Sequence, residues 1–476
     1  MSSNPRTQQV EYVVSSIILE PGEDRYEPLD LTQTFISADI YESLDKPYIT
    51  ADLILLDNRD WYEKYDILGG EKVTMVIESR KNTGGFTPTP IKKTFFIKSV
   101  ISNERVDENT QVVVFSLYED ILYAANLQNL NRFYEGKGSE IIEKISKEFL
   151  KRHDGNGTEV SLDPNGGADD QQKYNLIVPN LDPLQACKWI CDKMSTDKGF
   201  PFFLYSSLYT EKLILRNLEQ LLRSPPINPG QNQEYHYGQS RTMNDDPNLA
   251  RKVIVSAKLG KSEDLFKIIE KGHIGSDICY LNTALPDAST EIRFDYDVVK
   301  DTLKPALDAS VFPRHQNNPG YTPSFKYDGK PFNEYQSRNI TLLGGSNPFR
   351  LDDLPTDGSI PQYPLALGEA YDEAQYKLFV SSQAIKSLLT KAPLTMIING
   401  VDFIDGDNHS TIGNQIRCSF FKTNRDKENK NELAEKDSKM SGDYLIYRTR
   451  HILKKNRYDL TLTMCKLTSA AEGGVK

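Results

Sequence analysis

The sequence predicts a mainly β protein with an α+β insert. Its 476 residues include 25 tyrosines and 20 phenylalanines but only two tryptophans, and aromatic side chains suit the half-buried surface of a sheet. Short β-branched runs broken by Gly and Pro occupy both ends of the chain, whereas two segments between them carry apolar residues at helical spacing. We therefore expect two similar small β-barrel domains, a helix-containing domain and an extended arm.

Residues 1–125 are expected to form the first β-barrel domain. Their β-rich segments alternate with breaks such as residues 81–90, which read KNTGGFTPTP. Each segment has the length and the β-branched content of a strand. The expected strands are 10–19, 51–57, 71–79, 93–102 and 111–119.

Residues 126–245 are expected to form the α+β insert, with a first helix over 138–152. Ser139 is the expected N-cap, because its hydroxyl can accept a backbone N–H of the first helical turn. The helix then presents one apolar stripe toward a core. That stripe consists of Ile141, Ile142, Ile145 and Phe149.

The second helix of the insert is expected to begin directly after Asp182. Asp182 caps it, and Pro183 occupies the first helical position, where a missing N–H costs nothing. Apolar residues recur at helical spacing at Leu184, Cys187, Ile190 and Cys191. Residues 201–207 and 212–221 are expected to form a hairpin that these helices cover.

The remaining chain is expected to hold the second β-barrel domain and an arm. The second domain is discontinuous, over 246–300 and 391–468, and its strands end in a hairpin within 443–467. Residues 301–390 are rich in Pro, Gly and Asn and form the extended arm, with a helix over 367–389. Residues 422–440 are a solvated charged loop, and residues 469–476 are a flexible tail.

The two ends of the chain look like one unit used twice. Residues 68–77 read LGGEKVTMVI and residues 412–421 read IGNQIRCSFF. Around both, the order is strand, Gly turn, strand, polar loop and hairpin, with a one-residue gap after the Gly turn. The alternative is that any two antiparallel β segments look alike. If the duplication is real, three copies would offer six similar units around an axis.

Three stretches resemble the baseplate hub proteins of contractile-tailed bacteriophages, of the T-even type, which are related to the N-terminal part of type VI secretion spike proteins. They are residues 130–150, 178–222 and 442–467. The resemblance implies two β-barrel tube domains around a channel, with the other domains outside. It also implies a homotrimeric structural protein that joins the hexameric tail tube to the trimeric cell-puncturing spike.

The resemblance further implies the partners and the location. The partners are the trimeric tail spike protein, tail tube proteins, baseplate wedge proteins and viral DNA that passes through the channel without specific binding. The location is the tail baseplate of a virion assembled in the host cytoplasm. The arm over 301–390 is expected to contact neighbouring baseplate proteins.

Charge and apolar patterning agree with a protein that does not grip nucleic acid or enter a membrane. The net charge is −10, and an acidic wall repels a phosphate backbone. The N-terminus lacks the pattern of a secretory signal, and no apolar run approaches the ~18 residues that a membrane helix needs. Five cysteines, an odd number, favour buried thiols in a reducing compartment.

We expect no catalytic residue, no cofactor and no metal site. Cys187 and Cys191 have no CxxC motif or His cluster nearby, so we interpret both as small apolar core residues. His409 with Asp405 and Asp407 is the nearest approach to a cation-binding constellation. A turn between strands is the alternative, because Asp, Asn and Gly favour turns.

Acidic residues are frequent enough that carboxylate pairs can be chosen by eye, such as Asp169 with Asp170 or Glu119 with Asp120. Glycoside hydrolysis needs two carboxylates facing each other across a cleft, which sequence neighbours do not supply. The basic run over 448–457, RTRHILKKNR, lies near the last expected turn. It either meets an acidic partner or is a solvated turn.

Two other functions stay open at the level of sequence. One is a baseplate enzyme that cleaves peptidoglycan or another polysaccharide. The other is a spike component of a type VI or extracellular injection system, which keeps the binding role and changes the setting.

Overall fold

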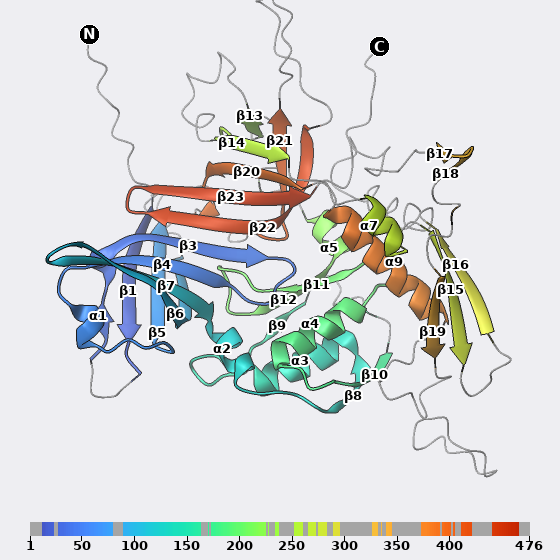
Figure 1. Cartoon of the computed structure of the whole chain (residues 1–476), viewed down its shortest axis with the longest axis horizontal. Helices are drawn as coiled ribbons and strands as arrows, with labels where there is room; N and C mark the ends of the chain where they lie inside the picture. The colour runs from blue at the N-terminus through green and yellow to red at the C-terminus, as the bar shows by residue number, and fades with distance from the viewer. Residues whose placement is uncertain are drawn as a thin grey trace, which may run out of the picture.

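The computed structural model is mainly β, with strands from both ends of the chain and helices between them (Figure 1). This confirms the expected fold class. None of the helices among the described residues combines the length and the apolar content of a membrane span. The structure describes residues 12–22, 27–79, 89–162, 170, 173–224, 227, 234–237, 252–259, 265–272, 275–282, 289–295, 326–331, 335, 339–344, 373–390, 393–400, 403–404, 411–420 and 440–465.

The N-terminal strands form one half of a large antiparallel sheet. Along β4 and β7 every second residue is buried, so one face of the sheet covers a core and the other is half-exposed. A short 3-10 turn (Thr32–Thr34) and α1 (Trp61–Lys64) connect strands of this half. The strands are β1 (Tyr12–Glu20), β2 (Leu29–Asp30), β3 (Phe35–Ser43), β4 (Thr50–Asp57), β5 (Lys72–Ser79), β6 (Ile91–Asp107) and β7 (Thr110–Glu119).

The C-terminal strands continue the same sheet. Its order is β14-β20-β23-β22-β3-β4-β7-β6-β5-β1-β2, and β13 and β21 branch from β22. Figure 1 shows the red strands β22 and β23 lying along the blue β3. Pairings among the described residues do not close this sheet into a barrel. The C-terminal strands are β13 (Tyr235–Tyr237), β14 (Ser256–Leu259), β20 (Leu394–Asn399), β21 (Gln415–Phe420), β22 (Gly442–Lys454) and β23 (Arg457–Cys465).

The insert between the two halves combines helices with small sheets. β8 pairs with β10, and β12 pairs with both β11 and β9. The expected hairpin is confirmed as β11 and β12, which are antiparallel. The elements are α2 (Asp120–Asn126), β8 (Phe133–Lys137), α3 (Gly138–Phe149), β9 (Val160–Ser161), β10 (Lys173–Ile177), α4 (Pro183–Lys193), β11 (Phe202–Tyr205), β12 (Leu213–Asn217) and α5 (Leu218–Arg223).

The two expected helices of the insert are present, and one of the two expected caps is right. The Asp182 carboxylate accepts the N–H of Gln185 at 2.8 Å, as expected for the N-cap of α4. The expected cap of α3 is wrong, because Lys137 is its N-cap residue and Ser139 lies within the first turn. Ser139 donates both its N–H and its hydroxyl to Asp170, at 2.8 and 2.9 Å.

The middle of the chain adds a smaller sheet and a helix. β15 (Gly275–Asn282) pairs with β16 (Ser289–Asp295) and with β19 (Asn339–Gly344). Of the described strands in 246–300, only β14 therefore pairs with the large sheet, and the domain boundaries given above remain a prediction. The expected helix is present as α9 (Glu373–Leu389); α7 (Leu265–Glu270) and the hairpin of β17 (Lys326–Tyr327) and β18 (Lys330–Pro331) complete the described elements.

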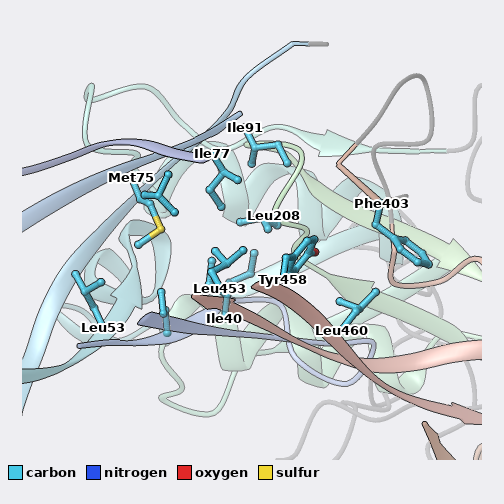
Figure 2. Packing of buried hydrophobic residues seen from close by; sticks show 14 of the residues in the cluster. Ile40, Leu53, Met75, Ile77, Ile91, Leu208, Phe403, Leu453, Tyr458 and Leu460 are labelled. Atoms are coloured by element: carbon cyan, nitrogen blue, oxygen red, sulfur yellow. The ribbon is translucent and has the colours of Figure 1, made fainter. Parts of the chain in front are cut away.

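Among the described residues, two hydrophobic cores hold the insert and the large sheet together. The first belongs to the insert and includes one face of α9, through Val380, Ala384, Ile385 and Leu389. The second lies beneath the large sheet and takes side chains from both ends of the chain. Figure 2 shows Ile40, Leu53, Met75, Ile77 and Ile91 of the N-terminal strands gathered with Leu453, Tyr458 and Leu460 of the C-terminal strands and Leu208 of the insert.

Candidate functional site

The candidate site is the joint between two copies of the same strand arrangement. We call β3 to β7 the N-terminal module and β14 with β20 to β23 the C-terminal module. In the first, β4 pairs with β7, β7 with β6, β6 with β5 and β3 with β4, all antiparallel. In the second, β20 pairs with β23, β23 with β22, β22 with β21 and β14 with β20, again all antiparallel. The topology of these five strands therefore repeats.

An irregularity of the sheet repeats at the equivalent place. The β6–β7 ladder shifts register between Ile97 and Ser99, and the β22–β23 ladder shifts between Ile446 and Arg448. A β-bulge of this kind places one extra residue in a strand and re-aims it. The shared bulge aligns the two modules residue by residue, with Ile97 matching Ile446.

The Gly turn also repeats. The N–H of Gly70 donates to the carbonyl of Ile97 at 2.7 Å, and the N–H of Gly413 donates to the carbonyl of Ile446 at 3.0 Å. Both glycines have positive φ, +91° and +80°, which side chains rarely adopt. Gly70 therefore matches Gly413, and Gly69 is the additional residue. The one-residue gap expected after the Gly turn is wrong, because the extra residue, Gly69, comes before the matching glycines.

The modules meet along one antiparallel pairing, of β3 with β22. It runs from Ser43 opposite Arg448 to Ser37 opposite Lys454. The two modules differ on their other side, since β1 is antiparallel to β5 whereas β13 is parallel to β21. The joint thus turns two modules into one continuous sheet.

A buried polar network lies at this joint. The Glu42 carboxylate and the His451 ring, both fully buried, are 2.7 Å apart, and the other ring nitrogen lies 2.7 Å from the Tyr458 hydroxyl. Glu42 also accepts the Leu208 N–H and the Thr411 hydroxyl, each at 2.7 Å. Burial acts to raise the pKa of Glu42, but the facing His451 and these hydrogen bonds outweigh it and lower the pKa. Glu42 is therefore held as a carboxylate.

A second buried network joins the N-terminal module to the insert. Lys93 lies 2.7 Å from Glu119, and the Arg152 guanidinium lies 3.0 Å from Glu119 and also contacts Asp120 and Glu211. Burial acts to raise the pKa of Glu119, but the two cations lower it to about 2. The three carboxylates are close enough to hold a metal ion. Lys93 pairs with Glu119, and Arg152 pairs with all three carboxylates, so we assign them a structural role.

This arrangement does not suit Glu119 and Asp120 as the carboxylate pair of a glycosidase. A general acid must carry a proton near neutral pH, whereas the pKa of Glu119 is about 2. Both side chains are buried, so they do not face each other across a cleft.

The loop between β11 and β12, residues 206–212, touches both networks. Ser206 donates to Glu119 at 2.9 Å, and the carbonyl of Thr210 accepts from Lys93 at 3.0 Å. The next residues of the loop contact the network at the joint, where the Leu208 N–H donates to Glu42. The Tyr209 hydroxyl donates to the carbonyl of Phe403 at 3.1 Å. One loop of the insert thus ties the two modules together.

The other candidate residues have structural partners or lie outside the described residues. Cys187 and Cys191 are fully buried in the insert core, as expected; burial raises the pKa of Cys191 to about 11 and that of Cys187 further. Asp170 is 3% exposed and binds the first turn of α3. Asp169, Asp405, Asp407 and His409 lie outside the described residues.

The two arginines of the basic run, Arg448 and Arg450, lie on the exposed face of the sheet, whereas the neighbouring His451 is buried. Arg450 donates to Asp39 at 2.8 Å, and Arg448 lies 3.3 Å from Asp45. An open groove of about 430 Å³ runs beside them. Its lining includes Tyr41, Tyr48, Thr461 and Thr463. Carboxylates of the same face balance these two arginines.

No protein-family profile and no curated protein sequence matches this chain. Similar solved structures include a tail protein from Neisseria meningitidis (12% identity, TM-score 0.46, covering 97% of this chain and 98% of that one). They also include the 43 kDa tail protein of prophage MuSo2 from Shewanella oneidensis (10%, 0.47, 96% and 100%). A third is the Francisella PdpA–VgrG complex (8%, 0.44), where the match spans 98% of this chain and 54% of that one.

Proposed function

We propose that this chain is a structural component of a phage tail baseplate, specifically a trimeric hub between the hexameric tail tube and the trimeric spike. The observation that carries the proposal is the repeated five-strand topology, joined into one sheet by β3 and β22. The three stretches that resemble baseplate hub proteins, 130–150, 178–222 and 442–467, support the same function.

The geometric argument concerns symmetry. Three copies of a chain with two equivalent modules present six equivalent surfaces on one face of a ring, and three on any face made by the rest of the chain. Such a ring matches a six-fold tube on one side and a three-fold spike on the other. A single module per chain would match only one of the two partners.

The proposed role is mechanical and needs no catalytic residue. The hub holds tube and spike in register, contacts the baseplate wedge proteins, and leaves a channel for DNA once the spike departs. The net charge of −10 supports passage of DNA without specific binding. The location that follows is the tail baseplate of a virion.

Co-expression with the tube and spike proteins of the same tail tests this function. We expect the chain to form a complex with each partner separately and a ternary complex with both. Binding to neither, with the chain correctly folded, would overturn the proposal. A cell-wall turnover assay tests the rival enzyme function, and we expect no activity above a buffer control.

A further inference from the structure

The two modules have equivalent edges, but only one pair of those edges is joined within the chain. The joint uses the outer edge of β3 and the outer edge of β22. By the repeated topology, β14 is the equivalent of β3 and β6 is the equivalent of β22. Within the part of the chain that the structure describes, the outer edges of β14 and of the second half of β6 pair with no strand.

The second half of β6 projects beyond its neighbour. β5 pairs with β6 only from Ile91 to Phe96, whereas β6 continues to Asp107. On this unpaired stretch Ile101 is 57% exposed and Val106 is 65% exposed. An edge with free backbone groups and apolar side chains is a surface for another strand.

The edge of β14 is exposed at positions that the joint buries. Leu259 pairs with Leu394 of β20, as Ile40 pairs with Ala51 of β4, so the two are equivalent. Ile40 is fully buried beside β22, whereas Leu259 is 55% exposed. The same position is thus buried by β22 at the joint and exposed at the outer edge of β14.

The joint also supplies a register for the missing pairing. Asp39 of β3 faces Ile452 of β22. The ladder with β20 makes Lys258 the equivalent of Asp39, and the ladder with β7 makes Glu104 the equivalent of Ile452. In that register Lys258 stands directly opposite Glu104, and the two charges are opposite in sign.

We propose that β14 of one copy pairs antiparallel with the second half of β6 of a neighbouring copy, with Lys258 facing Glu104. Directly opposed side chains of an antiparallel pair lie about 5 Å apart, within reach of an ion pair. The same register places Leu259 beside Asn103 and Ala257 beside Arg105. The occupant of each edge is a second copy of this chain, because the β3–β22 joint already contains the same pairing.

The closure of these contacts into a ring of three rests on the proposed function. A head-to-tail contact closes only when its rotation fits the number of copies, and otherwise it propagates as an open filament. The pairing itself rests on the repeated topology alone. The two claims can therefore fail separately.

Disulfide trapping tests the register. The variant with Lys258→Cys and Glu104→Cys is oxidised in its assembled state and separated under denaturing, non-reducing conditions. Opposed strand positions meet the Cα separation that a disulfide needs. We expect a covalent trimer as the final product. The matched control combines Lys258→Cys with Asn103→Cys, which is one residue off register and points to the other face, and should not cross-link.

The outcomes separate the two claims. A chain that is trimeric in native mass measurement but gives no cross-link, or cross-links equally well in the control, overturns the proposed pairing. A ladder of dimers, trimers and longer species supports the pairing and contradicts the closed hub. The single variants control for the native cysteines, of which Cys187, Cys191, Cys418 and Cys465 are buried.

Charge exchange gives a second measurement that needs no oxidation. Lys258→Glu places like charges opposite each other and should weaken each contact about two- to fivefold, as expected for an exposed pair. Adding Glu104→Lys restores the opposite charges and should recover assembly. Recovery of assembly in the double variant supports the register. If the losses of assembly caused by the two substitutions add up in the double variant, the register is contradicted.

Discussion

Removal of Lys93 should destabilise the chain far more than removal of an exposed lysine. The Lys93 ammonium is 2% exposed and lies 2.7 Å from the fully buried Glu119. It also donates to the carbonyls of Ser207 and Thr210. Lys93→Met keeps much of the side-chain volume but leaves Glu119 with one cation, Arg152, and leaves two carbonyls without this donor.

The magnitude follows from the pKa of Glu119. Its fall from 4.5 to about 2 corresponds to about 3 kcal/mol of interaction with the ionised form. Breaking a buried ion pair from one side costs about 3–5 kcal/mol. Because Arg152 remains 3.0 Å away, we expect a loss near the lower end, about 3 kcal/mol. Lys72→Met, which removes a solvent-accessible pair with Glu20 whose side chains are 25% and 42% exposed, should cost less than about 1 kcal/mol.

The assay is urea unfolding followed by tryptophan fluorescence. Trp61 lies in the core under the N-terminal strands and Trp189 packs on the insert core, so the two tryptophans report on both sides of the network. Equal shifts of the unfolding midpoint for Lys93→Met and Lys72→Met would refute the reasoning.

The pH dependence of stability gives an independent check on the same network. A carboxylate with a lowered pKa stabilises the fold above its unfolded pKa, and that contribution is lost as the pH falls through the folded value. For Glu119 the loss should extend from about pH 4.5 down to about pH 2. Lys93→Met should lose less over this window, and a parallel decline in both proteins would contradict this.

Three further predictions concern the joint, the cap and the Gly turns. Glu42→Ala leaves His451 buried without its carboxylate and should cost about 3 kcal/mol, seen as faster hydrogen exchange in β3 and β22; unchanged exchange there would count against the network. Asp170→Ala should cost about 1 kcal/mol, because the first turn of α3 loses the two hydrogen bonds from Ser139. Thermal unfolding measures this, and an unchanged melting temperature would rule out a stabilising role for Asp170. Gly70→Ala should cost about 1 kcal/mol, and the matched Gly413→Ala should cost more. An added Cβ would lie 2.8 Å from the Tyr205 hydroxyl at Gly413, but 3.8 Å from its nearest neighbour at Gly70. Equal melting temperatures of the two variants would contradict this prediction.

Local signals in the sequence predicted local structure well. α4 begins as expected because Asp182 and Pro183 specify a helix start within a few residues. The strands with strict alternation, β4 and β7, are predicted correctly because three successive buried positions in each are apolar. These are Ala51, Leu53 and Leu55 in β4, and Val113, Phe115 and Leu117 in β7. The repeated unit can be recognised in the sequence because a backbone position with positive φ requires glycine in both modules, at Gly70 and at Gly413.

The strand at the joint was missed for a physical reason. β3 reads FISADIYES, and its buried face carries Ala38, Ile40 and Glu42. A small residue and a carboxylate interrupt the apolar alternation that identifies a strand. Glu42 belongs on that face only because His451, distant in sequence, lies 2.7 Å from its carboxylate across the β3–β22 pairing.

The cap of α3 and the ionic network were missed for the same kind of reason. Asp170 reaches Ser139 from a loop 31 residues later, whereas capping rules consider the next few residues only. Nothing in the local sequence distinguishes Lys93 and Arg152 from other lysines and arginines of the chain. Their burial depends on how the insert packs against the N-terminal module, which no local pattern records.

The most direct test of the central claim is electron microscopy of the purified assembly viewed along its axis. We predict a three-fold ring in which six similar densities, two from each chain, surround a central channel. A two-fold particle, or a three-fold ring whose densities do not repeat within each chain, would contradict it.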